Sequence, residues 1–169
     1  MRIVKFLFIS ALVLFGVLTA LSLLFPSRLR VSRAINVAAP RGRIDTAIGD
    51  LHRWVLWNKF VQATPLTGMT FSTPSSGVGA FLHADQLSLT VTTATPDSMA
   101  LDWRLSNGKH FEGGYNILQN GGDSMVIQSW FDFHFRWYPW EKLGILVYDK
   151  NFGPVMEESL SGLKRYLEN

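Results

Sequence analysis

The apolar residues divide the chain into an N-terminal apolar run and a longer segment with mixed periodicities. Residues 6–25 contain no charged side chain over 20 positions. A helix of that length covers roughly 30 Å, which is the thickness of the hydrocarbon core of a bilayer. Pro26 follows the run, and basic residues flank it on both sides. We therefore predict that residues 1–27 form a membrane anchor and that residues 28–169 form one folded domain.

A cleaved signal peptide is the competing interpretation of this run. Signal peptides have an apolar core of roughly 7–15 residues and a small-x-small cleavage site. Here the run is longer, and Leu18 stands two positions before Ala20, where a cleavage site would have a small residue. A buried core helix is the third interpretation, and the apolar residues on every side of the helix disfavour it.

The orientation of such an anchor depends on the charges beside it. Arg28, Arg30 and Arg33 follow the run closely, with Arg41 and Arg43 further on, while Arg2 and Lys5 precede it together with the amino terminus. Positive charges prefer the cytoplasmic side of a membrane. The count favours a cytoplasmic domain by a small margin, so the opposite orientation stays open. The expected location is a membrane, with a bacterial inner membrane as the first candidate.

The segment after the anchor begins with a strand and a short helix and continues as a series of strands. Residues 29–37 are rich in β-branched residues, and Pro40 suits the first turn of a helix that follows. Apolar residues then alternate with polar ones between residues 87 and 137. Turn signals at Pro96-Asp97, at Asn107-Gly108 and at 120–123 separate these runs. The pattern predicts an antiparallel meander with one buried face.

Helical periodicity returns after Pro139 and continues to the end of the chain. The apolar stripe consists of Trp140, Leu143, Val147, Met156, Leu160, Leu163 and Leu167. Gly153-Pro154 interrupts the stripe, so we expect a kink or a restart of the helix at that point. The order of strand, helix, antiparallel strands and long helix predicts an α+β fold in which the last helix lies across one face of the sheet.

The net charge of the whole chain differs in sign from that of the segment after the predicted anchor. The formal net charge is +3, with 16 basic and 13 acidic residues. Residues 1–33 hold five of the basic residues and no acid, which leaves 11 basic and 13 acidic residues, a net charge of −2, for residues 34–169. That balance argues against a nucleic-acid binder. The absence of cysteine excludes disulfides and Cys-ligated metal sites.

Patterns typical of metal and nucleophile sites are missing. The four histidines have no His-x-x-x-His or His-Glu-x-x-His spacing, and no Gly-x-Ser-x-Gly motif occurs. We therefore expect neither a metal nor a cofactor. His134 with Asp132 is a conceivable acid–base pair. The better interpretation is a cross-strand charge ladder, because both residues alternate with the apolar face.

The aromatic face of the predicted sheet is the most informative feature. One face of the predicted last strand carries Phe131, Phe133, Phe135 and Trp137, which stand at every second position. On the neighbouring strands, the same side of the sheet is expected to carry Trp103 and Tyr115. These side chains form either an ordinary core or the wall of an apolar pocket, and composition does not distinguish the two. The candidate lining of such a pocket is Trp103, Tyr115, Phe131, Phe133, Phe135, Trp137, Leu143, Val147, Met156 and Leu160.

Three segments make the chain resemble the START-like, helix-grip domains of the SRPBCC superfamily, in particular its polyketide cyclase/dehydrase and lipid-transport group. Residues 31–40 resemble the family's first strand, which ends in a small residue and Pro. Asp50, Trp54, Trp57 and Asn58 match an Asp-x-x-x-Trp-x-x-Trp-Asn signature. Residues 149–164 are similar to the final helix. Lys59-Phe60 departs from the family pattern, which usually has Pro at that point.

The resemblance implies a helix-grip fold, in which a curved antiparallel sheet wraps around the C-terminal helix. It also implies a cavity between sheet and helix for a hydrophobic small molecule or lipid, held near a membrane by residues 6–25. One alternative is a polyketide cyclase/dehydratase-like enzyme, which needs a polar group such as Tyr115 or Arg104 in the cavity. Another is a non-catalytic interaction protein of the cell envelope, with a filled interior and an exposed apolar patch.

Overall fold

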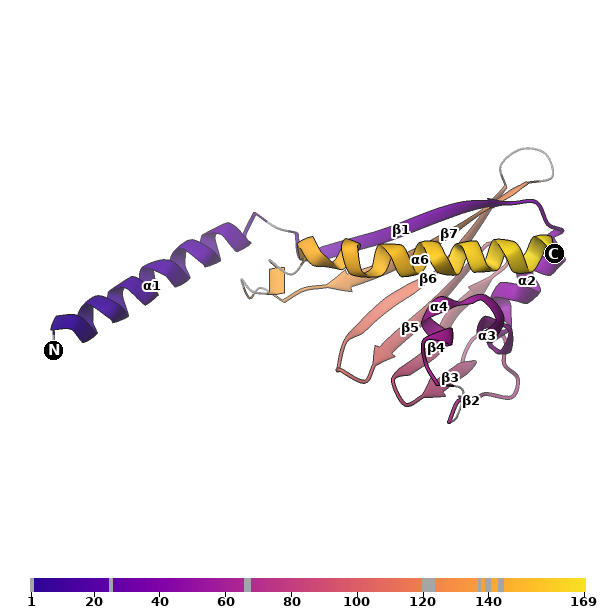
Figure 1. Ribbon diagram of the computed structural model, residues 1–169, viewed down its shortest axis with the longest axis horizontal. Coiled ribbons are helices and arrows are strands. Elements are labelled where there is room, and N and C mark those ends of the chain that lie inside the picture. Colours follow the sequence, from indigo (N-terminus) through magenta and orange to yellow (C-terminus); the bar gives the residue numbers. More distant parts are fainter. Residues whose placement is uncertain are drawn as a thin grey trace.

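The fold contains an N-terminal apolar helix and a sheet crossed by the C-terminal helix (Figure 1). The computed structural model describes residues 2–24, 26–65, 68–119, 124–136, 138, 141–142 and 145–169. The helices are α1 Arg2–Ser22, α2 Arg41–Gly49, α3 Trp54–Trp57, α4 Lys59–Gln62 and α6 Ile145–Glu168, and the 3-10 turn η1 spans Leu51–Arg53. The strands are β1 Arg28–Val37, β2 Thr70–Phe71, β3 Phe81–Ala84, β4 Leu87–Thr95, β5 Ser98–Leu105, β6 His110–Gln119 and β7 Met125–His134.

The strands form one antiparallel sheet in the order β1-β7-β6-β5-β4-β3-β2. Among the strands that the structure describes, the pairing of β1 with β7 alone joins strands distant in sequence, and β4 to β7 follow the predicted meander. Gly108 has a φ of +80° in the β5–β6 turn, which agrees with the expected Asn-Gly hairpin. The predicted turn at 120–123 lies outside the described residues.

The last helix packs along the inner face of the sheet, and α2, α3 and α4 extend that cover (Figure 1). Alternation explains why this face is apolar, because Phe131 and Phe133 of β7 are buried while His134 is exposed. The predicted α+β, helix-grip fold is confirmed. The centre of the core holds fully buried aromatic side chains, among them Trp54, Trp57, Trp103 and Phe131.

The last helix continues through Gly153-Pro154 as one element, so of the two expectations for this point, a kink or a restart, the restart is wrong. Arg33 of β1 explains part of this continuity. Its guanidinium bonds Asp149 at 3.0 Å and Glu157 at 2.6 Å, on either side of the proline. The apolar side chains of α6 also remain on the sheet across this point. Tertiary contacts thus compensate for the loss of the backbone hydrogen bond that Pro154 cannot donate.

Helix α1 is long and apolar enough to cross a membrane, and none of its apolar window is buried against the domain. This exposure contradicts a buried core helix. A signal sequence would satisfy the same length and composition. Figure 1 shows α1 projecting from the end of the domain where β1 begins and β7 ends. There the Phe135 amide donates to the Ser27 carbonyl at 2.9 Å, and Arg28 pairs with His134.

Candidate ligand pocket

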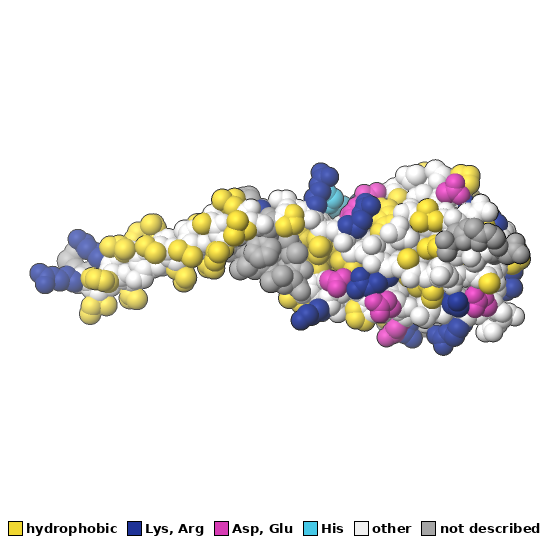
Figure 2. All heavy atoms as spheres, turned by 90° about the horizontal axis from the view of Figure 1, so that it is seen from above, with side chains coloured by type: hydrophobic (Ala, Val, Ile, Leu, Met, Phe, Trp, Pro, Cys, Tyr) yellow, Lys and Arg dark blue, Asp and Glu magenta, His cyan; other side chains and the backbone are white. Residues whose placement is uncertain are grey.

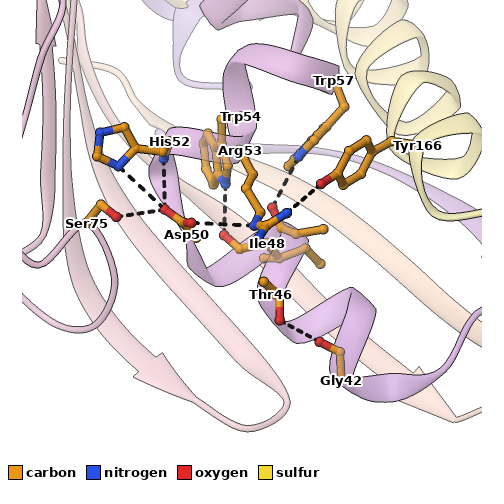
Figure 3. A network of polar contacts seen from close by, with 11 residues as sticks. Gly42, Thr46, Ile48, Asp50, His52, Arg53, Trp54, Trp57, Ser75 and Tyr166 are labelled. Carbon is orange, nitrogen blue, oxygen red and sulfur yellow. Dashed lines mark hydrogen bonds and ion pairs between the residues drawn. The ribbon is translucent and has the colours of Figure 1, made fainter.

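The Asp50-to-Asn58 motif forms a structural junction, and Figure 3 shows its part from Asp50 to Trp57. Asp50 Oδ1 accepts from the His52 amide at 3.0 Å and from Ser75 Oγ at 2.7 Å, which caps η1. The two indoles close the end of α2, because Trp54 Nε1 donates to a carbonyl of that helix at 2.8 Å and Trp57 Nε1 to another at 3.1 Å. These bonds satisfy backbone groups that the end of a helix leaves free.

Asn58 connects this junction to the sheet. Its side-chain oxygen accepts from the Phe60 and Val61 amides, which caps α4. Its Nδ2 donates to Tyr115 Oη at 3.1 Å. Tyr115 is 2% exposed, so its hydroxyl is hydrogen-bonded inside the core. It is therefore placed as a structural group and not as the polar group of a cavity.

Burial raises the pKa of Tyr115 above its ordinary value of 10, because the phenolate would lose its hydration. The unfolded state therefore releases this proton at a lower pH than the folded state. We expect the free energy of unfolding to be unaffected by this group below about pH 10 and to fall by up to about 1.4 kcal/mol per pH unit above it. Urea denaturation at several pH values tests this. Tyr115→Phe should remove the extra slope, and an equal slope in both proteins would contradict the assignment.

An aromatic cluster fills much of the space between the sheet and α6. We use this name for Phe60, Trp103, Phe111, Phe131, Phe133, Tyr148 and Phe152, which form a continuous network with ring centroids 4.7–6.3 Å apart. Many pairs meet edge to face, which is a favoured geometry for aromatic rings. Room for Phe131 comes from Gly113, where a Cβ atom would lie 2.1 Å from the Phe131 ring.

A partly open pocket of about 450 Å³ continues from the aromatic cluster at the end of the sheet nearest α1. We call it the mouth pocket. Phe111, Phe133, Phe135 and Tyr148 supply its apolar surface. Its remaining lining is polar and comes from the β5–β6 turn, the end of β7 and the segment before α6, namely Gly108, Lys109, His110, His134, Arg136 and Glu141.

A larger groove of about 690 Å³ lies on the opposite side of α6, between that helix and α3 and α4. Charged side chains account for much of its lining, including Lys59, Glu157, Glu158 and Arg165. None of the seven rings of the aromatic cluster lines it. The mouth pocket is therefore the better candidate for an apolar ligand, although it is smaller.

The predicted lining residues lie in different places. Phe133 and Phe135 line the mouth pocket. Behind it, Trp103, Tyr115, Phe131, Met156 and Leu160 are buried in the packed core. Val147 is 51% exposed, so its expected inward position is wrong. The helix turns Tyr148 and Phe152 inward instead, in line with Met156 at intervals of four residues. Trp137 and Leu143 lie outside the described residues.

Sequence reasoning missed several members of the site. Phe111 has the same parity as Tyr115 in β6, so the alternation already indicated its inward position. Tyr148 and Phe152 also had a signal, because they continue the i, i+4 spacing of Met156 and Leu160 across Pro154. No sequence pattern indicated the position of Phe60, because that position depends on how α4 packs against the sheet.

The outer face of the sheet carries the expected charges. Arg30 donates to both carboxylate oxygens of Asp132, and its guanidinium holds the pKa of that carboxyl below its usual value. Asp102 pairs with Arg104 and His110. Arg104 therefore points away from the interior, and neither it nor Tyr115 supplies a polar group to the mouth pocket.

Solved structures share this fold at low sequence identity. DynU16, a protein from the dynemicin biosynthetic locus, is 17% identical with a TM-score of 0.58, covering 83% of this chain and 47% of its own. The chain thus spans about half the length of DynU16. A START superfamily protein from Mycobacterium smegmatis is 17% identical with a TM-score of 0.55, covering 82% of this chain and 97% of its own.

Norcoclaurine synthase from Thalictrum flavum, solved in complex with dopamine and hydroxybenzaldehyde, has the same fold. It is 15% identical with a TM-score of 0.51, and the match covers 80% of this chain and 86% of the enzyme. A comparison with curated protein sequences finds no match. Residues 28–168, nearly the whole folded domain, match the family described as polyketide cyclase / dehydrase and lipid transport. The chain therefore belongs to this family, and it shares its fold with the START superfamily protein.

Proposed function

We propose that the chain is a membrane-anchored domain that binds a hydrophobic small molecule or lipid in the mouth pocket. The observation that carries the proposal is the continuity between the apolar side of this pocket and the aromatic cluster beneath α6. Pockets for small ligands are concave and about 300–1,000 Å³ in volume, and the mouth pocket lies within this range and has one apolar side.

Burial of apolar surface supplies the affinity in this proposal. Each Å² of apolar ligand surface removed from water contributes roughly 25 cal/mol. Phe135 and Tyr148, with ring centroids 5.0 Å apart, lie at the border between the pocket and the core and would contact the ligand first. The complex of norcoclaurine synthase with dopamine and hydroxybenzaldehyde supports the idea that this fold holds small molecules.

The anchor gives the pocket access to membrane-dissolved ligands in this proposal. Residues 23–27 connect α1 to β1, and β1 begins beside the end of β7 that forms the pocket wall. The mouth pocket would therefore open toward the membrane in which α1 lies. Apolar molecules concentrate there, because they leave water for the hydrocarbon core.

Replacing Phe135 by Glu tests the proposal, because it places a charge in the apolar part of the pocket without emptying the centre of the core. The full chain, purified from cells in a mild detergent, is extracted with organic solvent and examined by mass spectrometry. We expect a hydrophobic molecule to accompany the wild-type chain at a defined stoichiometry, and Phe135→Glu to reduce it at least fivefold.

Leu118→Glu is the matched control. Leu118 is 52% exposed and lies at the other end of β6, so the same change of charge should leave the bound molecule in place. No enriched molecule in the wild-type extract, or an equal amount with Phe135→Glu, would contradict the proposed site.

A further inference from the structure

Two cationic side chains border the mouth pocket. Lys109 comes from the β5–β6 turn and Arg136 from the segment after β7, and both line the pocket. In the part of the chain that the structure describes, neither forms an ion pair. Lys109 Nζ lies 5.1 Å from the centroid of the Tyr148 ring, which places its charge directly over the apolar surface.

The remaining titratable groups of the pocket offset these two cations only in part. Glu141 is the single carboxylate in the described lining, and one of its oxygens accepts from the Arg136 backbone amide at 2.8 Å. His110 is engaged by Asp102 on the outer face. His134, the other histidine, pairs in register with Arg28, which adds a further cation at the same end of the sheet. The described rim therefore has an excess of positive charge.

We propose that the mouth pocket selects an amphiphile with a single acyl chain and an anionic head group, and that Lys109 and Arg136 bind that head group. The proposal rests on the proposed function and adds the chemical class of the ligand. The acyl chain lies on Phe111, Phe133, Phe135 and Tyr148, and the head group stays at the rim, where water and both cations reach it. Charge-assisted hydrogen bonds of this kind are shorter and stronger than neutral ones.

The position of the rim fits an acidic ligand that arrives from a membrane. Figure 2 shows Lys or Arg side chains beside a His at the end of the domain that meets α1. Basic groups close to a membrane surface attract anionic lipids and acidic amphiphiles. The same charges that bind the head group would thus draw the ligand toward the pocket.

Bromine-labelled amphiphiles test the selection, because bromine quenches the fluorescence of nearby tryptophans. Trp103 stacks on Phe111, one of the pocket residues, with ring centroids 5.9 Å apart. The full chain is placed in nanodiscs of phosphatidylcholine and titrated with 9,10-dibromostearate or with the neutral 9,10-dibromostearyl alcohol. We expect saturable quenching by both probes and an apparent dissociation constant about tenfold lower for the acid, as two charge-assisted contacts would give.

The double variant Lys109→Gln with Arg136→Gln should bind both probes with equal affinity. Lys59→Gln with Arg165→Gln removes the same charge from the groove across α6 and should keep the preference for the acid. Equal affinities in the wild-type chain, or an unchanged preference in the Lys109 and Arg136 variant, would overturn this inference while leaving the proposed function intact. No saturable quenching by either probe would overturn both.

Discussion

Trp54→Ala is expected to lower the free energy of unfolding of the domain by about 3–5 kcal/mol, as in other substitutions of large buried aromatic side chains. Trp54 is 0% exposed, and its ring contacts those of Trp57, Trp103 and Tyr115 at centroid distances of 5.5–6.1 Å. Its Nε1 also donates to the Ile48 carbonyl. The substitution therefore creates a cavity and removes a hydrogen bond at the end of α2.

Urea denaturation of the full chain in a mild detergent, followed by circular dichroism, measures this loss. Leu56→Ala is the control within the same helix, because Leu56 is 60% exposed and should change stability by less than about 0.5 kcal/mol. A loss below about 1 kcal/mol for Trp54→Ala would show that the Asp-x-x-x-Trp junction does not hold the helices on the sheet.

Gly114→Ala is expected to cost about 2–3 kcal/mol, at the upper end of the range for overpacking. A Cβ atom at this position would lie 2.0 Å from the Met99 carbonyl oxygen and 3.0 Å from Ala100 Cα. Both atoms belong to the backbone of β5, which pairs with β6 at this point. The new methyl group therefore forces two strands apart and cannot be accommodated by a change of rotamer.

Gly42→Ala is the control, and we expect it to raise the free energy of unfolding in the same measurement. Gly42 lies in α2, and nothing lies within 4 Å of a Cβ atom there. Alanine in a helix is more favourable than glycine by roughly 0.5–1 kcal/mol, so this variant should be more stable than the wild type. A neutral Gly114→Ala would contradict the strand packing described above.

Local periodicity was sufficient to predict the α+β order of first strand, helix, meander and last helix, because each of these elements carries its own pattern; the helix-grip arrangement was implied by the family resemblance. The alternation along β7 and the i, i+4 spacing in α6 both depend on neighbours within the same element. Continuity of α6 through Pro154 could not be predicted in this way. It depends on Arg33, which lies 116 residues before Asp149 in the chain and reaches both Asp149 and Glu157.

How the space between the sheet and α6 is filled could not be predicted from the periodicity of the sequence, for a similar reason. Periodicity places Phe131 and Trp103 on the inner face, but it does not show that Phe60 and Phe152 fill the space in front of them. Where the remaining space opens depends on the pairing of β1 with β7 and on the β5–β6 turn. The pocket residues could therefore be predicted only in part.

Photo-crosslinking with a diazirine-bearing fatty alcohol tests the central claim, an apolar ligand site in the mouth pocket, most directly. The full chain in nanodiscs is irradiated with the probe, digested and mapped by mass spectrometry. We expect labels on peptides that contain Phe111, Phe133, Phe135 and Tyr148, and their loss when an excess of unlabelled alcohol is added. Labels confined to the apolar residues of α1, where the probe meets the chain within the bilayer, would contradict the account.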